Sequence, residues 1–346
     1  MATIAQAIRL ALRYAEQELG VRNIFGQDVG PPLGGAFTIT QGLDSAWNSP
    51  LDERGIVGTA AGLAMMGETC VCEIQFGDYI FNTVDLLRLI GNTCWATRGQ
   101  FPMPMVLMAP VGAGRHGGIY HSHSIESILS HLPGWKIVMP SNSRDAYGLM
   151  VTAILDGNPV AYLIPKALAL SPAQALEGEP VNLKERINAP VKGRENWRPD
   201  WPEIPAFSVP IGKLDRRREG DRLTVVSYGR MIGIVESAIE QISESRVDGH
   251  IDLLDLRTLV PYDMDGLTAS VRKTGALLVV NEDSEQTNFG EHLIRVVSEA
   301  TSPRTAVLLG ARHLPGVGLS QSLEDHTVPT VDRVAKALDH MLPGTD

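Results

Sequence analysis

Cysteine is scarce in this chain, whose 346 residues contain only Cys70, Cys72 and Cys94. Three thiols at these spacings match neither a disulfide framework nor a zinc motif, so we expect a reducing cytoplasm as the location. Cys70 and Cys72 lie two residues apart in an expected strand and therefore share one face of it. That placement suits packing in a core better than metal binding.

Positive charge and long apolar runs are also in short supply. Lysine and arginine number 30 against 40 aspartates and glutamates, and the net charge of −10 argues against a nucleic-acid partner. No apolar run approaches the roughly 20 residues that a membrane-spanning helix needs, so no membrane partner is expected. Residues 1–19 alternate apolar side chains with charged ones such as Arg9 and Glu16. This pattern predicts an amphipathic helix and not a signal peptide.

The length suits two domains of roughly 150 residues each. Short apolar runs alternate with helical patterns in both halves, which predicts mainly parallel sheets covered on both faces. The expected strands are residues 70–76, 105–109, 136–139, 160–164, 223–228, 251–256, 276–280 and 306–309. The expected helices are residues 55–66, 81–94, 124–131, 144–155, 231–242, 264–271, 291–300 and 331–341. The fold class is therefore α/β, with two doubly wound three-layer α/β/α domains.

We expect a first domain over residues 1–165 and a second over residues 211–346. Residues 166–210 between them carry seven prolines at irregular spacing and little periodicity. Such a segment is typical of a long connection on the surface. Trp197 and Trp201 within it indicate that part of the connection docks on an apolar surface.

An acid, Glu53, stands just ahead of a run of small residues that predicts a closely packed helix. Position alone favours an acid that compensates the helix dipole. The alternative is a partly buried carboxyl group whose pKa suits proton transfer.

Aromatic and acidic residues follow the strand that begins at Cys70, among them Phe76, Asp78 and Tyr79. Open α/β sheets bind ligands beyond the carboxyl ends of their strands, so an aromatic ring here suits stacking on a flat heterocycle. An aromatic side chain that plugs the edge of the sheet is an equally good interpretation.

A glycine-rich segment, residues 112–124, follows another strand and holds His116, His121 and His123, with His131 in the next helix. Glycine-rich turns let the backbone approach a ligand closely. General acid–base or anion-binding chemistry suits these histidines better than a metal site, because no cysteine or regular carboxylate partner accompanies them. A nicotinamide-dinucleotide motif is not supported, because the spacing fails at the third glycine.

These clusters follow one another in a recognisable order. The segments GQDVG (26–30), PLDERGIVG (50–58), EIQF (73–76), YHS (120–122) and DLRTLVP (255–261) span most of the chain. Together they resemble the β subunit of the thiamine-diphosphate-dependent, decarboxylating component of 2-oxoacid dehydrogenase complexes. Relatives in that family act on branched-chain 2-oxoacids, pyruvate or acetoin, and their domains are transketolase-like.

The resemblance implies roles for individual residues. Glu53 would hydrogen-bond the aminopyrimidine of thiamine diphosphate and so promote loss of the proton from its thiazolium carbon. Leu51, Gln75 and Tyr79 would line the aminopyrimidine pocket, with Tyr79 as the stacking ring. His121 would act as proton donor in the reductive acylation of lipoyl groups.

A potassium ion is a further implication of the resemblance. In relatives a loop holds this ion largely through backbone carbonyls, and the matching positions are Ala153, Ile154, Asp156 and Asn158. An ordinary helix C-terminus at Gly157 explains the same residues equally well.

The family's magnesium-binding Gly-Asp-Gly motif does not occur in this sequence. The resemblance therefore implies that a separate α subunit holds magnesium and the diphosphate, in an α2β2 heterotetramer with two active sites. It further implies an oxidoreductase subunit that decarboxylates a branched-chain 2-oxoacid or pyruvate and passes the acyl group to lipoyllysine on the dihydrolipoamide acyltransferase core. The alternatives are an acetoin dehydrogenase β subunit and a non-catalytic paralogue with an assembly or regulatory role.

The sequence also departs from the family pattern. Gln27 stands where relatives usually have an acid, and His123 and Ile125 replace a more usual Gln and Pro. Asn281 and residues 287–290 differ from the expected His and Gly-rich pattern. These departures bear on substrate choice and docking, and they leave Glu53 and His121 in place.

Overall fold

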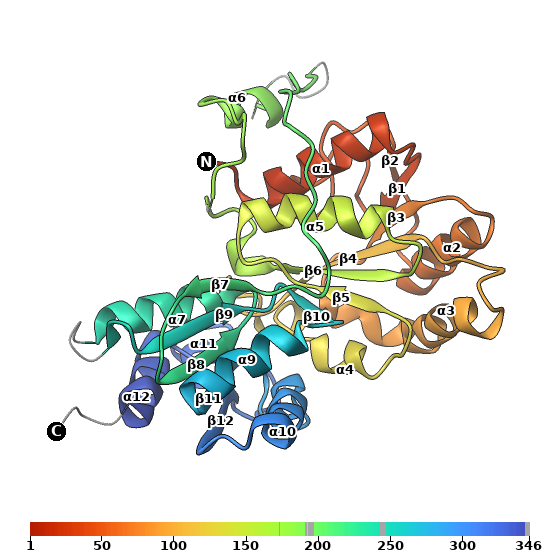
Figure 1. Cartoon of the computed structure of the whole chain (residues 1–346). Coiled ribbons are helices and arrows are strands. Elements are labelled where there is room, and N and C mark those ends of the chain that lie inside the picture. The colour runs from red at the N-terminus through yellow and green to blue at the C-terminus, as the bar shows by residue number, and fades with distance from the viewer. Residues whose placement is uncertain (173, 191, 193–196, 243–246, 343–346) are drawn as a thin grey trace. The chain divides into compact units, whose positions relative to one another are not determined.

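The computed structural model describes residues 1–172, 174–190, 192, 197–242 and 247–342 (Figure 1). The chain divides into two compact units. Unit 1 comprises Met1–Val111 and His131–Ile211, and unit 2 comprises Gly112–Ser130 and Gly212–Asp346. Each unit is an α/β body built on a mainly parallel sheet, as the sequence predicts. None of the described helices is both long enough and apolar enough to cross a membrane.

The sheet of unit 1 is parallel and buried on both faces. Its strands lie in the order β5-β6-β4-β3-β1-β2, and every neighbouring pair among them is parallel. Their bounds are β1 Asn23–Gly26, β2 Ala46–Asn48, β3 Cys70–Glu73, β4 Met105–Val111, β5 Lys136–Val138 and β6 Val160–Pro165. The continuous apolar runs of β4 and β6, and of β3 up to its last residue, Glu73, follow from burial on both faces.

Helices cover both faces of this sheet (Figure 1). On one face lie α1 (Ile4–Glu18) and α5 (Ser143–Leu155), and on the other lie α2 (Glu53–Met65) and α3 (Val84–Ala96). Alternate strand residues point to opposite faces. Val71 therefore joins the core beneath α1 and α5, whereas the thiol of Cys70 lies 3.6 Å from the Ala60 carbonyl oxygen of α2.

Helix α1 is more deeply buried than its charge pattern predicts. Arg9 is only 1% exposed, and its guanidinium donates to the Ile187 carbonyl at 2.6 Å and to the Thr38 hydroxyl at 2.9 Å. Burial lowers the pKa of Arg9 to about 10. Glu16 is buried as well and pairs with Arg13 at 2.5 Å. The amphipathic helix that the sequence predicts is present, and Arg9 is buried where it contacts the described part of residues 166–210 at Ile187 and Asn188.

That segment was also expected to lie on the surface, and the structure corrects this. It contains a 3-10 helix, η4 (Lys166–Leu168), and a short helix, α6 (Leu183–Ile187). Several of its apolar side chains belong to the core of unit 1: Ala169, Leu176, Leu183, Ile187 and Val209. Trp201 packs against this core, with the guanidinium carbon of Arg13 5.4 Å from its ring centroid. The expected docking of a tryptophan on an apolar surface is therefore confirmed for Trp201.

Unit 2 holds a sheet with strand order β12-β11-β8-β9-β7, in which only β7 is antiparallel to its neighbour. The bounds are β7 Asp215–Arg218, β8 Leu223–Ser227, β9 Ile251–Asp255, β11 Ala276–Ser284 and β12 Thr305–Ala311, with β10 at Thr258–Val260. The helices among the described residues of the unit are α4 Glu126–Ser130, α7 Arg230–Gln241, α9 Met264–Thr274, α10 Phe289–Thr301, α11 Gln321–Thr327 and α12 Val331–Met341.

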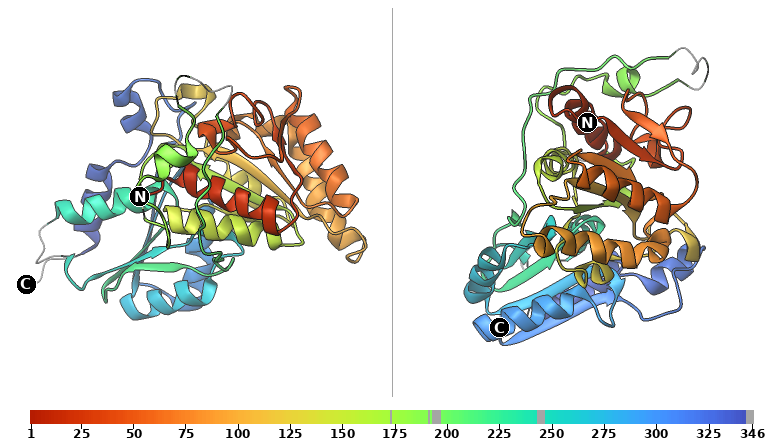
Figure 2. Two further views of the ribbon diagram at one scale, coloured as in Figure 1. Left: turned by 90° about the horizontal axis from the view of Figure 1, so that it is seen from above. Right: turned by 90° about the vertical axis from the view of Figure 1, so that its right-hand side faces the viewer.

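The two faces of this second sheet are covered by different helices (Figures 1 and 2). Val225 of β8 shares a core with α7 and α12. The next residue towards the N-terminus, Thr224, points the other way and bonds Ser270 and Thr274 of α9. All the strands and helices predicted from the sequence are present in the two units, with ends within a few residues of the predicted ones.

Candidate active site

Helix α2 begins at Glu53, as the small-residue pattern predicts. Asp52 is the N-cap residue, and its side chain makes no capping hydrogen bond. The half-buried Glu53 carboxylate instead accepts a hydrogen bond from the Asn82 amide at 3.3 Å. Glu53 therefore occupies the positive end of a helix dipole and has a polar partner from another segment.

Tyr79 lies near this carboxylate. It belongs to a 3-10 helix, η2 (Gly77–Thr83), which follows β3 and packs against α2. Its ring is 36% exposed and meets Phe76 edge-on at a centroid distance of 6.4 Å. Partial burial, with the charges of Asp78 and Glu53, raises the pKa of the Tyr79 hydroxyl. The structure thus brings two of the predicted site residues, Glu53 and Tyr79, into one neighbourhood.

Arg54 fixes the geometry of this neighbourhood. Its guanidinium makes a two-point contact with the carboxylate of Asp85 in the first turn of α3, with one N–O distance of 2.7 Å. The same group donates to the Asn82 carbonyl at 3.3 Å. Because Arg54 follows Glu53 in α2, this contact holds the Asn82 amide where it reaches the Glu53 carboxylate.

Leu51 and Gln75 flank the same region in different ways. Leu51 directly precedes the N-cap residue and is 68% exposed. Gln75 follows β3, and its amide donates to the Gln27 carbonyl at 3.2 Å. A carboxylate near exposed apolar and aromatic side chains suits a flat heterocycle that carries an N–H donor. The residues present therefore fit an aminopyrimidine ring.

Glu73 is a buried acid at the end of β3. It is 1% exposed and accepts a hydrogen bond from the Ala36 backbone N–H at 2.9 Å, while its second oxygen has no hydrogen-bond partner within the described residues. Burial raises the pKa of the Glu73 carboxyl to about 7, and the Ala36 bond opposes this only in part. Gly35 makes the close approach possible, since a Cβ there would lie 3.2 Å from Glu73 Oε2.

The wild-type protein is expected to lose stability as the pH rises, and Glu73→Gln is expected to abolish this loss. A carboxyl whose pKa rises from 4.5 to about 7 on folding binds its proton more tightly in the folded state. The folded state therefore loses stability as the pH rises through this window, by on the order of 3 kcal/mol. Glutamine keeps the acceptor for Ala36 and carries no charge.

Urea unfolding across this pH window measures the effect. The unfolding free energy of Glu73→Gln should increase relative to wild type as the pH rises, whereas Glu68→Gln, at an exposed acid, should track the wild type. If the difference in unfolding free energy between Glu73→Gln and wild type stays constant with pH, the raised pKa assigned to Glu73 is refuted.

The predicted histidine loop, residues 112–124, belongs to unit 2. Its two ends meet, because the Gly112 N–H donates to the His123 carbonyl at 3.0 Å. Gly112 has a φ of 82°, a conformation that favours glycine. Between these ends lies a 3-10 helix, η3 (Gly118–Tyr120), and His121 follows it directly in a half-buried position.

The middle of the loop packs against a segment near the C-terminus of the same unit. A Cβ on Gly316 would lie 2.8 Å from the Ile119 side chain, and one on Gly118 would lie 3.5 Å from Leu319. The loop that carries His121 is thus supported at its ends and along its middle.

The predicted potassium positions lie at the end of α5. Ala153 and Ile154 are in the last turn of the helix, and Asp156 is its C-cap. The Asp156 carboxylate accepts from the Asn158 backbone N–H at 3.0 Å and pairs with the Lys136 ammonium. Burial acts against ionisation of Asp156, but these hydrogen bonds hold its pKa below the ordinary value. A cation at this turn would therefore depend on backbone carbonyls.

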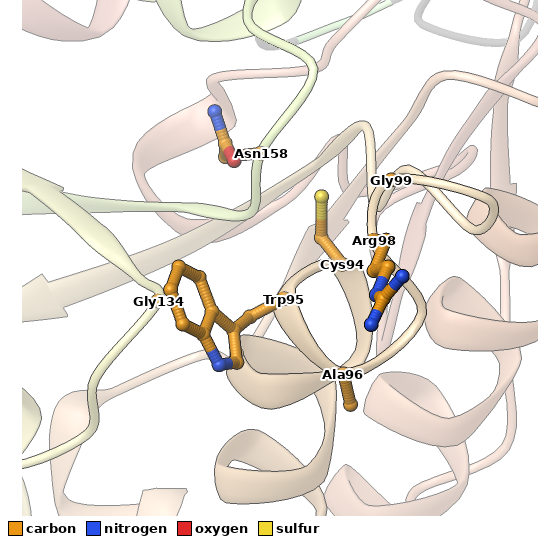
Figure 3. Close-up of a pocket in the computed structure, with 8 residues that line it drawn as sticks. Cys94, Trp95, Ala96, Arg98, Gly99, Gly134 and Asn158 are labelled. Atoms are coloured by element: carbon orange, nitrogen blue, oxygen red, sulfur yellow. The ribbon is translucent and has the colours of Figure 1, made fainter.

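Two cavities of unit 1 are lined by residues other than Glu53, Tyr79 and His121. One of about 730 Å³ lies at the end of α3, and Figure 3 shows Trp95, Arg98 and Cys94 there, with Asn158 on a separate segment. The other, of about 500 Å³, is lined by residues from 31–46 and from the 166–210 segment, including Trp197 and Arg198. The described residues contain no group of three His, Cys, Asp or Glu side chains suited to a metal ion.

Comparisons with known proteins bear on both units. The family profile described as transketolase, pyrimidine binding domain, matches residues 1–170, and transketolase, C-terminal domain, matches residues 212–334. The 2-oxoisovalerate dehydrogenase subunit beta of Pseudomonas aeruginosa is 34% identical over 311 residues, which cover 86% of this chain and 82% of the relative. The chain belongs to the family of 2-oxoacid dehydrogenase β subunits.

Further relatives support the same family. The 2-oxoisovalerate dehydrogenase subunit beta of Bacillus subtilis is 30% identical and covers 96% of both chains. The pyruvate dehydrogenase E1 component subunit beta of Staphylococcus epidermidis is 33% identical, covering 86% of this chain and 85% of its own. A solved structure of split-gene transketolase, an inactive β4 tetramer, matches 99% of each chain with a TM-score of 0.73 and 19% identity. That structural likeness concerns the fold alone.

Two supporting residues near Glu53 have no signal in the sequence. Asn82 lies 29 positions from Glu53, and Asp85 lies 31 positions from Arg54. No local pattern links residues that far apart. Glu73 does stand in the predicted cluster, but its depth depends on the loop around Ala36, which only the fold places there.

Proposed function

We propose that this chain is the catalytic β subunit of an enzyme that oxidatively decarboxylates a branched-chain 2-oxoacid or pyruvate and acylates lipoyllysine. The observation that supports this most is the placement of the Glu53 carboxylate at the start of α2, beside Tyr79 and hydrogen-bonded to Asn82. Family membership restricts the chemistry, and this arrangement supplies the acid that the chemistry needs.

Each residue of the cluster has a proposed task. Bound thiamine diphosphate supplies the electron sink for decarboxylation. Glu53 holds a proton against the aminopyrimidine, and Asn82 orients the Glu53 carboxylate. Tyr79 offers its ring for stacking, while Leu51 and Gln75 border the heterocycle.

His121 is proposed to donate a proton during acyl transfer to the lipoyl group. The loop that carries it is anchored at both ends, which suits a group that must meet a substrate in one orientation.

The remaining parts of the site are assigned to partners. An α subunit would hold the diphosphate and magnesium in an α2β2 heterotetramer, and a lipoylated dihydrolipoamide acyltransferase core would receive the acyl group. We retain residues 1–165 as the pyrimidine-binding domain, 166–210 as the connection and 211–346 as the C-terminal domain. A potassium ion at Ala153, Ile154, Asp156 and Asn158 stays a prediction.

A substrate panel tests the proposal. The chain, assembled with its α partner and thiamine diphosphate, should reduce an artificial electron acceptor with branched-chain 2-oxoacids or with pyruvate. If the assembled enzyme turns over acetoin and none of the 2-oxoacids, the chain is an acetoin dehydrogenase β subunit. If it turns over none of these compounds, the chain is a non-catalytic paralogue.

A further inference from the structure

Residues 112–124 form the His121 loop, and we call its two ends, at Gly112–Ala113 and at Ser124, the neck of the loop. Both ends contact Glu282, at the carboxyl end of β11. A carboxylate oxygen of Glu282 accepts from the Ala113 backbone N–H at 3.1 Å, and its backbone carbonyl accepts from the Ser124 hydroxyl at 3.3 Å. The contact at Gly112 is equally close, since a Cβ there would lie 2.3 Å from Glu282 Oε1. Both ends of residues 112–124 therefore meet one glutamate.

Arg230 holds this glutamate in place. Its guanidinium lies 2.9 Å from Glu282 Oε2, and both side chains are largely buried. Arg230 is the first residue of α7 and makes this contact with β11 within unit 2. A charge-assisted bond with little access to water holds the Glu282 carboxylate aimed at the loop.

Asp283 fastens the residues that follow the loop. Its carboxylate accepts from the Ser127 backbone N–H of α4 at 3.3 Å. The Ser127 hydroxyl accepts in turn from the Phe289 N–H of α10 at 2.9 Å. The loop is thus continued by a short helix that is tied to both β11 and α10.

Glu126 completes the cluster. It is 1% exposed, and one oxygen accepts from the Tyr228 hydroxyl at 3.2 Å, whereas the other is buried with no partner in the described part of the chain. Burial, followed by the charge of Asp283, raises the pKa of Glu126 well above its ordinary value. The charged groups that face the cluster are Glu282, Arg230 and His123 as well as Asp283. Burial raises the pKa of Asp283 as well. Glu126 is the more deeply buried of the two and has the unpartnered oxygen, so Glu126 is the neutral member.

We propose that Glu282, Asp283 and Glu126 are positioning residues that hold the His121 loop and helix α4 against β11. We call this set of contacts the mount. The proposal rests on the proposed function only for the role of His121. It predicts that removing a contact between Glu282 and the loop slows the step that uses His121 and leaves decarboxylation at the Glu53 site unaffected.

Glu282→Gln tests the mount by two independent measurements. In hydrogen exchange on the full chain, protection of the amides in residues 113–124 should fall at least about tenfold, while α12 stays unchanged. In the enzyme assembled with its α partner, lipoyl acylation should fall by a similar factor, and dye-coupled decarboxylation should remain at the wild-type rate.

Matched variants sharpen the result. Glu299→Gln removes an acid from a surface pair with Arg295 and should alter neither measurement. Glu126→Gln keeps a neutral side chain of the same size, so protection of the loop should remain as in wild type. If Glu282→Gln does not fold, Ser124→Ala removes a single hydrogen bond between the loop and Glu282. This variant should still lower the hydrogen-exchange protection of the loop selectively.

Unchanged protection of the loop in the folded Glu282→Gln variant would overturn the mount, as would an equal loss throughout unit 2. Loss of protection in Glu126→Gln would overturn the assignment of a protonated Glu126. Selective loss of protection in an enzyme that lacks lipoyl acylation even as wild type would uphold the mount and refute the proposed function.

Discussion

Glu53→Gln is expected to lower thiamine-diphosphate-dependent decarboxylation by on the order of 10²–10⁴-fold. Glutamine keeps the length of the side chain and an oxygen that can accept from Asn82, so the local hydrogen bond survives. It cannot hold and release a proton, which is the task proposed for the carboxyl group. The dye-coupled rate of the assembled enzyme, with saturating cofactor and 2-oxoacid, measures this loss.

A matched control separates chemistry from folding. Glu68 is an exposed acid just beyond the end of α2, and Glu68→Gln should leave the rate unchanged. Both variants should retain the unfolding free energy of the wild type within about 1 kcal/mol. A folded Glu53→Gln enzyme with a near-normal rate would remove Glu53 from the mechanism.

His121→Ala is expected to separate the two half-reactions. Acyl transfer to lipoyllysine should fall by about 10²–10⁴-fold, because a positioned proton donor contributes on this scale. Decarboxylation with an artificial electron acceptor should persist, since that assay bypasses the lipoyl group. The ratio of the two rates in one preparation is the measured quantity, so differences in enzyme concentration cancel.

The control is another histidine of the same sequence cluster. His131 is exposed and lies beyond α4, and His131→Ala should change neither rate. Equal loss of both rates in His121→Ala would show that His121 serves the decarboxylation step or the fold, and would contradict the proposed division of labour.

The sequence predicts the architecture well where burial is continuous. The strands β4 and β6 are apolar throughout, and β3 is apolar up to its last residue, Glu73, because both faces of the sheet are covered. That pattern is visible without a structure. The edge strand β7, Asp-Arg-Arg-Arg, was missed, because a half-exposed antiparallel edge carries charged residues and no apolar run.

The burial of two charged residues of α1 could not be predicted from the sequence, because it depends on contacts with distant segments. Arg9 and Glu16 look like surface charges in the helical pattern of α1, yet both are buried. Arg9 donates to the carbonyl of Ile187, a residue more than a hundred positions away, and Glu16 accepts from the Ser45 backbone N–H. No local periodicity contains that information.

The candidate site was predictable in its reactive groups and not in their supports. Glu53, Tyr79 and His121 stand in recognisable segments, and the structure places Glu53 near Tyr79. Asn82 and the Glu282–Arg230 pair act through contacts across loops or between elements. Such contacts depend on the fold, so a sequence pattern alone does not reveal them.

The most direct test of the central claim compares the purified chain, its α partner and their mixture in dye-coupled 2-oxoacid decarboxylation, with and without thiamine diphosphate. We predict turnover only when both subunits and the cofactor are present, because this chain is proposed to supply the aminopyrimidine half of the site. Turnover by the chain alone would contradict that claim.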